Sequence, residues 1–272
     1  MTTVAQIREH YDSLALIYRT FWGDHIHHGL FTDHESPEIA QVRLLDYCVR
    51  LLELRGGEIV LDAGCGHGGT LLYLSRRFGC RGKGLTISPK QGRIARENAL
   101  QAHLADRLEF IVEDVGCFRF PAEAFDIIWA MESSEHFGDK ARFFCNAASS
   151  LRAGGQLLLA AWTGSMQSHR VRDVARSFLC PQLWTAEEYK SSIEAAGLQL
   201  IHDRNLTAQV TPTWTVCQKR VRFAQPTIKL LPRAAREFVQ GIDVILDAYR
   251  SGELTYTVMI AQKPLVTCAM PS

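Results

Sequence analysis

The sequence lacks an excess of charge of either sign. Thirty Lys and Arg residues stand against 29 Asp and Glu residues, which leaves a formal net charge of +1 over 272 residues. A protein that binds nucleic acid or an anionic membrane surface usually carries a clear basic excess. We therefore expect no nucleic-acid partner.

A long apolar run is missing as well. No segment approaches the ~20 apolar residues that a membrane-spanning helix requires. The first residues include Glu9 and Asp12, although signal and transit peptides avoid acidic residues there. We therefore expect a cytoplasmic protein with no membrane span.

Paired cysteines are absent too. The eight cysteines lie far apart and form no C-x-x-C motif. This distribution is typical of reduced, mostly buried thiols rather than of a zinc site or a disulfide framework.

Short apolar runs alternate with helical patterns from residue 58 onward, which predicts a parallel sheet wrapped by crossover helices. The expected strands lie near residues 58–63, 81–87, 108–112, 125–131, 155–162, 198–202 and, after a helical insertion, 254–262. The intervening helices are expected to begin near residues 68, 88, 137 and 185. Two of these helix starts carry capping patterns, Ser88 with Gln91 and Thr185 with Glu188, in which each partner is placed to bond the other's backbone.

The N-terminal segment has the pattern of an amphipathic helix. Apolar or aromatic residues stand at positions 4, 7, 11, 14, 18 and 21, a spacing that lines one helix face. That face either covers the body of its own domain as a flap or forms a dimer seam, which leaves open a homo-oligomer through this helix.

A glycine-rich segment, residues 60–69, follows the first expected strand. Glycines let the backbone turn tightly at the strand ends, where open α/β sheets bind ligands. Gly64, Gly66 and Gly69 also satisfy the dinucleotide pattern G-x-G-x-x-G. The neighbours favour a different ligand: a dinucleotide site would have an acid where this chain has Thr86, and Asp62 would repel a pyrophosphate but suit a cation.

S-adenosylmethionine (SAM) is such a ligand, because it bears an ammonium and a sulfonium group and no phosphate. The segment Asp62–Gly66 and the late strand resemble those of class I SAM-dependent methyltransferases. Segments 22–31, 84–91 and 131–136 resemble the γ-tocopherol methyltransferase group, and Thr86 with Glu135-His136 is also similar to the cyclopropane and mycolic-acid methyltransferases.

The resemblance implies a fold. It is an α/β, Rossmann-like seven-stranded sheet of order 3-2-1-4-5-7-6, with an antiparallel seventh strand, an N-terminal helical flap and a lid insertion before the last strand. Within one compact domain we expect a flap at residues 1–55, a cofactor-binding core at 56–203, a lid or substrate insertion at 204–253, and the last strand and tail at 254–272.

The resemblance also implies a cofactor site for SAM, with S-adenosylhomocysteine (SAH) as product. The residues that it places there are His27, Asp62, Gly64, Cys65, Gly66, Thr86, Ile87, Gln91, Asp114, Val115 and Met131. Asp62 would lie near the amino group, His27 would close the carboxylate end, and Asp114 would accept the adenine amino group. Thr86 departs from the broader class I pattern, in which an acid holds the ribose. Each assignment has a structural alternative, such as a tight turn for the glycines or a capping role for Gln91.

The acceptor site has its own candidates. Methyl transfer mainly requires alignment of the reactants and exclusion of water, so a closing lid is expected. Side chains that predict a large apolar pocket, or alternatively ordinary core, are Tyr18, Phe21, Trp22, His28, Trp162, Trp214, Phe223 and Tyr249. Glu135 and His136 are the catalytic candidates, as a base or a stabiliser of positive charge, although Glu135 could instead cap the helix expected near 137.

The histidines at 25, 27, 28 and 34 form a cluster, but no carboxylate-rich partner with metal-ligand spacing accompanies them, and no metal is expected. The sequence therefore predicts a methyltransferase for a small, largely apolar acceptor, such as a prenylated aromatic, an isoprenoid or an alkaloid-like amine. C-methylation stands slightly ahead of N- or O-methylation. The alternatives are an NAD(P)-dependent oxidoreductase that uses the same glycines and a non-catalytic SAM-binding module.

Overall fold

A seven-stranded sheet forms the centre of the computed structural model, which describes residues 2–22, 25–223 and 233–265 and, for residues 16–22 and 233–234, only the backbone. The sheet order is β3-β2-β1-β4-β5-β7-β6. The strand β7 runs antiparallel to both of its neighbours, and the other pairs are parallel. The strands are β1 (Ile59–Ala63), β2 (Arg81–Thr86), β3 (Leu108–Val112), β4 (Phe125–Met131), β5 (Leu151–Gly164), β6 (Gln199–Asn205) and β7 (Leu254–Gln262). The predicted order and the antiparallel seventh strand are confirmed.

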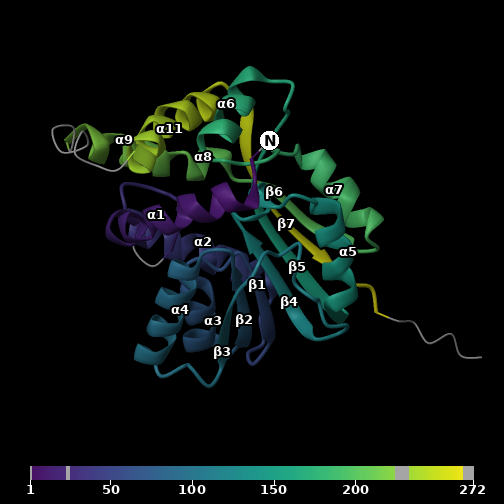
Figure 1. Ribbon diagram of the computed structural model, residues 1–272. Coiled ribbons are helices and arrows are strands. Elements are labelled where there is room, and N and C mark those ends of the chain that lie inside the picture. The colour runs from purple at the N-terminus through teal and green to yellow at the C-terminus, as the bar shows by residue number, and fades with distance from the viewer. Residues whose placement is uncertain (1, 23–24, 224–232, 266–272) are drawn as a thin grey trace, which may run out of the picture.

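Helices cover both faces of the sheet and one of its ends. They are α1 (Val4–Trp22), α2 (Pro37–Leu52), α3 (Gly69–Phe78), α4 (Pro89–Gln101), the 3₁₀ turn η1 (Ser134–His136), α5 (Lys140–Ser150), α6 (His169–Ser177), α7 (Ala186–Ala195), α8 (Thr207–Val210), α9 (Pro212–Phe223) and α11 (Arg233–Arg250). In Figure 1, α2, α3 and α4 flank one face and α5 and α7 the other, while α1, α6, α8, α9 and α11 gather beyond one end of the sheet.

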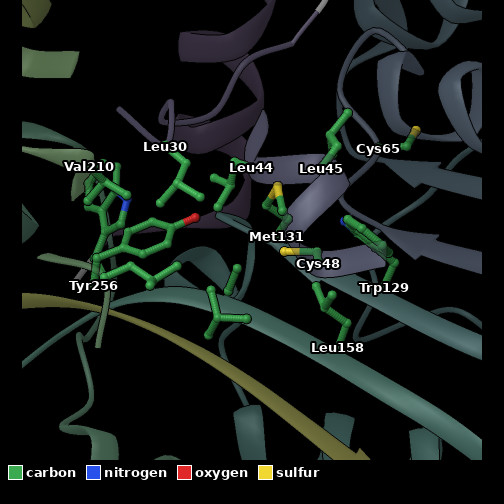
Figure 2. Packing of buried hydrophobic residues seen from close by; sticks show 14 of the residues in the cluster. Leu30, Leu44, Leu45, Cys48, Cys65, Trp129, Met131, Leu158, Val210 and Tyr256 are labelled. Atoms are coloured by element: carbon green, nitrogen blue, oxygen red, sulfur yellow. The ribbon is translucent and has the colours of Figure 1, made fainter. Parts of the chain in front are cut away.

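The two faces follow from the period of a strand, because successive side chains point to opposite sides. Val60 of β1 belongs to the core shared with α2, α3 and α4, and the next residue, Leu61, belongs to the core shared with α5 and α7. Figure 2 shows Leu44, Leu45 and Cys48 of α2 packed near residues of the sheet. The helix α2, which lies within the predicted flap of residues 1–55, is therefore part of the main core.

Three expectations about the elements are corrected. The helix expected near 137 begins at Lys140, because η1 and a short loop intervene. The strand expected at 155–162 extends over Leu151–Gly164. The helix α6 was not expected, because it has only nine residues, although its three buried residues, Val171, Val174 and Ala175, follow the helical spacing.

Two further expectations concern the chain as a whole. No helix within the described ranges is long and apolar enough to cross a membrane. The seven cysteines in the described part of the chain are all free thiols; Cys117 and Cys145 are exposed, and the other five are buried or half-buried.

Candidate functional site

A cavity lies at the carboxyl ends of β1, β2 and β4. It contains about 760 Å³ of space, part of it open to solvent, and is called the cofactor cavity here. Its lining residues are Val4, Ile7, Tyr11, Ile26, Gly64, Gly66, Leu85, Thr86, Ile87, Gln91, Glu113, Asp114, Val115, Met131, Glu132, Ser133, His136 and Phe137. Eight of the predicted cofactor residues are therefore brought together in one space.

A smaller hollow, the Asp62 hollow, adjoins this cavity and shares Ile26, Gly64, Gly66 and Met131 with it. Its remaining lining residues are His25, His27, Asp62, Cys65, His67, Gly69 and Thr70. All the predicted cofactor residues thus line one of two connected spaces.

Asp62 is the unusual group of the hollow. It is 3% exposed, and its Oδ2 atom has no hydrogen-bond partner. Burial raises the pKa of this carboxyl to about 7. A buried carboxylate that the protein leaves unpaired is costly, so the hollow is suited to a ligand that brings a positive charge.

Gly64 is required by its surroundings. Its φ is +101°, and a Cβ atom there would lie 2.3 Å from Cβ of Ser133 at the end of β4. Any side chain at position 64 would clash with Ser133, so glycine is needed for the ends of β1 and β4 to approach each other at the cavity.

The capping box predicted for Ser88 and Gln91, after the end of β2, is only half formed. Ser88 accepts a hydrogen bond from the Gln91 backbone at 3.1 Å, as expected. The Gln91 side chain does not return to Ser88, because its Oε1 accepts from the Thr86 hydroxyl at 2.8 Å, and the Ser88 N–H donates to the same hydroxyl oxygen. Thr86 and Gln91 therefore hold each other at the cavity wall. The other predicted box, between Thr185 and Glu188, is complete.

The helix α1 lies over the cofactor cavity. Val4, Ile7 and Tyr11, on its predicted apolar face, line the cavity, and Leu14 is fully buried. Outside the cavity, Arg8 Nε donates to the carbonyl of Ile87 at 3.0 Å. At Ile7, Tyr11 and Leu14 this face therefore contacts the rest of its own chain, while Val4 is 39% exposed.

Asp12 secures the same helix at a second point. Its Oδ1 accepts from the Ser88 hydroxyl at 2.5 Å and from the Lys90 backbone at 3.1 Å. These donors stand at the N-terminus of α4, where a negative charge is favourable.

A second space, the aromatic pocket, contains about 540 Å³, part of it open to solvent, and shares Tyr11, Ile26, Glu132 and His136 with the cofactor cavity. Its other lining residues are His10, His27, His28, Glu135, Trp162, Phe178, Trp214 and Phe238. The Tyr11 hydroxyl lies 2.8 Å from His136 Nε2, which joins α1 to η1 at the boundary of the two spaces.

The predicted acceptor residues divide into four groups. His28, Trp162 and Trp214 line the aromatic pocket. Tyr249 is buried behind His28, with its hydroxyl 3.3 Å from His28 Nε2, and is not a lining residue. Phe223 is 93% exposed, because it ends α9 on the surface, so its assignment is wrong. The side chains of Tyr18, Phe21 and Trp22 lie outside the described residues.

Glu132 is the central residue that the sequence did not single out. One carboxylate oxygen accepts from the His28 backbone at 2.7 Å and from the Tyr256 hydroxyl at 2.9 Å. The other accepts from His28 Nδ1 at 2.7 Å and from Trp162 Nε1 at 3.3 Å. Burial raises the pKa of Glu132, but these contacts with His28 outweigh it, and the pKa is lowered overall.

This carboxylate fixes His28 in one tautomer. The indole Nε1 of Trp214, which can only donate, lies 2.6 Å from His28 Nε2. The proton of the neutral ring therefore sits on Nδ1 and is donated to Glu132. The result is a chain of contacts from β4 through the loop at residues 25–31 to α9. Glu132 lies in the segment 131–136 that the sequence analysis had identified. Its left-handed backbone conformation, with φ +50°, could not be predicted from the sequence.

Glu135 is not a helix cap. The side chain of Asp139 caps α5, and Glu135 is buried in η1, where its Oε1 accepts the backbone N–H of Trp162 at 2.7 Å. Burial raises the pKa of Glu135 to about 8. At neutral pH this group is therefore mostly protonated and a weak base.

The raised pKa of Glu135 predicts a pH effect on stability. Between about pH 4.5 and 8 the folded protein keeps a proton that the unfolded chain loses, so this group's contribution falls as pH rises through that window. The amide of the Glu135→Gln variant cannot ionise. We expect this variant to gain about 1–3 kcal/mol relative to the parent between pH 5 and pH 8, measured by urea unfolding of both proteins. An unfolding difference that stays constant with pH would contradict the raised pKa.

The histidine cluster is divided between the spaces. His25 lines the Asp62 hollow, His28 the aromatic pocket and His27 both, while His34 is exposed beside Asp33. Among the described residues, no group of three or more His, Cys, Asp and Glu side chains is arranged to hold a metal ion.

Comparison with known proteins agrees with this geometry. The family model described as mycolic acid cyclopropane synthetase matches residues 1–241. A 27-O-demethylrifamycin SV methyltransferase of Amycolatopsis mediterranei is 29% identical and covers 96% of this chain and 98% of its own. A chloroplastic tocopherol O-methyltransferase of Arabidopsis thaliana is 26% identical, over 95% of this chain and 82% of its own.

Solved structures share the fold. The crystal structure of a mycolic acid cyclopropane synthase complexed with SAH and CTAB superimposes with a TM-score of 0.85 at 20% identity, over 96% of this chain and 98% of that one. The resemblances inferred from the sequence are therefore confirmed. The chain belongs to the mycolic acid cyclopropane synthetase family of SAM-dependent methyltransferases.

Proposed function

We propose that this protein transfers a methyl group from SAM to a small, largely apolar acceptor held in the aromatic pocket. The observation that carries the proposal is the junction of the two spaces, where Tyr11, Ile26, Glu132 and His136 belong to both walls. A donor in the cofactor cavity and an acceptor in the aromatic pocket would meet there without crossing solvent.

The cofactor side fits SAM. The unpaired Oδ2 of Asp62 would receive the ammonium group, and Gly64 gives the backbone room beside it. Gln91, whose Oε1 is occupied by Thr86, retains its amide N–H groups for the ribose hydroxyls. Asp114 and Val115 line the cavity and would border the adenine. When bound, SAM supplies an electrophilic methyl group on a sulfonium.

The acceptor side is shaped for an apolar molecule. Trp162, Phe178, Trp214 and Phe238 form aromatic walls. The helix α1 covers the junction, where Tyr11 contacts His136, and would limit the entry of water once both ligands are bound. C-methylation of an alkene would develop a cation that these aromatic faces could stabilise, whereas O-methylation needs a group that accepts a proton.

Apolar burial should dominate the choice of acceptor. Each CH₂ group that leaves water contributes about 0.8 kcal/mol. We therefore expect kcat/KM for 4-geranylphenol to exceed that for phenol by at least roughly 100-fold, measured with labelled SAM and mass spectrometry. Similar values for the two phenols, or no methylation of either by protein that binds SAM, would contradict the proposed acceptor class.

A further inference from the structure

His27 carries an unused lone pair in a buried place. The residue is 6% exposed, and its Nδ1 lies 2.7 Å from the carbonyl oxygen of His28. Since a carbonyl can only accept, Nδ1 carries the proton of the neutral ring and Nε2 carries the lone pair. Nε2 is buried and has no hydrogen-bond partner.

The position of the His27 ring places this lone pair near the proposed ligand sites. His27 lines both the Asp62 hollow and the aromatic pocket, and the preceding Ile26 lines these two spaces and the cofactor cavity. His27 therefore stands between the aromatic pocket and the Asp62 hollow, where the ammonium end of SAM is proposed to bind. A buried polar atom without a partner is costly, which favours a bound molecule that supplies an N–H or O–H group.

We propose that Nε2 of His27 accepts the proton of a hydroxyl group on the acceptor, so that the acceptor is an alcohol or a phenol and the product a methyl ether. This inference rests on the proposed function and narrows its substrate class. It also departs from the sequence-based assignment of His27 to the carboxylate end of SAM, because a lone pair would repel a carboxylate.

The step balances in atoms and charge. The acceptor O–H bond breaks and its proton passes to Nε2, while an oxygen lone pair forms the new C–O bond. The C–S bond to the transferred methyl breaks, its electron pair stays on sulfur, and the sulfonium becomes a neutral thioether. One positive charge leaves sulfur as one appears on the imidazole, so the buried site keeps its net charge.

The surroundings suit this transfer. Burial lowers the pKa of His27, so that the ring is neutral and ready to accept, and the negative charge of Glu132 acts in the opposite direction and favours the imidazolium once formed. Both ring nitrogens of His28 have partners. Nε2 of His136 contacts Tyr11, and its buried Nδ1 has no hydrogen-bond partner among the described residues, but His136 does not line the Asp62 hollow.

The His27→Asn variant tests the role in catalysis. Its amide N–H can replace Nδ1 as donor to the His28 carbonyl, while the lone pair at the Nε2 position is lost. With saturating SAM and 4-geranylphenol, we expect kcat to fall roughly 100-fold, the lower end of typical general-base effects, and the Kd for SAM to change by less than about 3-fold. The matched control is His34→Asn, at an exposed histidine, which should leave both values unchanged.

The outcomes separate the two proposals. An unchanged kcat in His27→Asn would overturn the role of His27 and leave the proposed function intact. A Kd for SAM raised tenfold with kcat retained would overturn it as well, because His27 would then hold the donor's amino group. Failure of the parent enzyme to methylate any small apolar acceptor would instead defeat the proposed function.

A binding experiment tests the same contact without turnover. With SAH bound, the parent enzyme should bind 4-geranylphenol about 5–10-fold more tightly than geranylbenzene, which lacks the hydroxyl, and His27→Phe should remove this preference. Equal preference in parent and variant would contradict the contact. If the variants do not fold, ¹⁵N-histidine NMR of the parent protein decides: the unprotonated Nε2 signal of His27 should shift with the phenol and not with geranylbenzene, and equal shifts would overturn the inference.

Discussion

Replacing Asp62 by alanine is expected to weaken SAM binding by at least roughly 100-fold. The carboxyl group is 3% exposed, and its Oδ2 has no partner within the described residues. Loss of one member of a buried charge pair costs about 2–5 kcal/mol, and each 1.4 kcal/mol is a factor of about ten in affinity. Isothermal titration calorimetry of parent and variant with SAM measures the effect.

Two further variants isolate the charge. Asp62→Asn keeps the shape of the side chain and should lose most of the same affinity, while Asp33→Asn, at an exposed acid, should bind as the parent does. Because burial raises the pKa of Asp62 to about 7, the parent should also bind SAM more tightly as pH rises from 6 to 8. Normal binding by Asp62→Ala would refute the assignment of Asp62 to the cofactor.

Replacing Glu132 by alanine should give the largest loss of stability. Four donors converge on this buried carboxylate: the backbone N–H and Nδ1 of His28, the indole of Trp162 and the hydroxyl of Tyr256. Removing the carboxylate leaves these donors buried without an acceptor, at about 1–3 kcal/mol each before any relaxation or entry of water. We expect a decrease of about 3–5 kcal/mol in the free energy of unfolding, measured in urea.

A surface carboxylate provides the control for Glu132. Glu109 pairs with Lys83 at 2.6 Å, but both side chains are about half exposed, and such pairs contribute about 0–1 kcal/mol. Glu109→Ala should therefore change the unfolding free energy by less than about 1 kcal/mol. If the two alanine variants lose similar stability, Glu132 is not the centre of a buried network.

Part of this site could be predicted because the elements that form it have periodic patterns of apolar residues. The alternation of apolar runs and helical patterns predicted the parallel sheet. The residues at the strand ends, Asp62, Thr86 and Met131, predicted the cofactor cavity and the adjoining Asp62 hollow, because parallel strands place their carboxyl ends at one edge. The stripe of Val4, Ile7 and Tyr11 predicted the helix face that now lines the cavity.

The rest depended on contacts between distant segments. Glu132 meets His28 across 104 positions and Tyr256 across 124, and no local pattern encodes such pairings. The choice of Gln91 between Ser88 and Thr86 depended on where the end of β2 comes to lie. The tautomer of His27 depended on the position of the His28 carbonyl, which is set by the tertiary structure.

The most direct test of the two-space site is a crystal structure of the protein with SAM and geranylbenzene, which fills the aromatic pocket but offers no hydroxyl. We predict the ammonium group at Asp62, the adenine beside Asp114 and Val115, and the methyl group directed to the junction at Tyr11 and Ile26. SAM bound at another place, or a methyl group that points away from the aromatic pocket, would contradict this site.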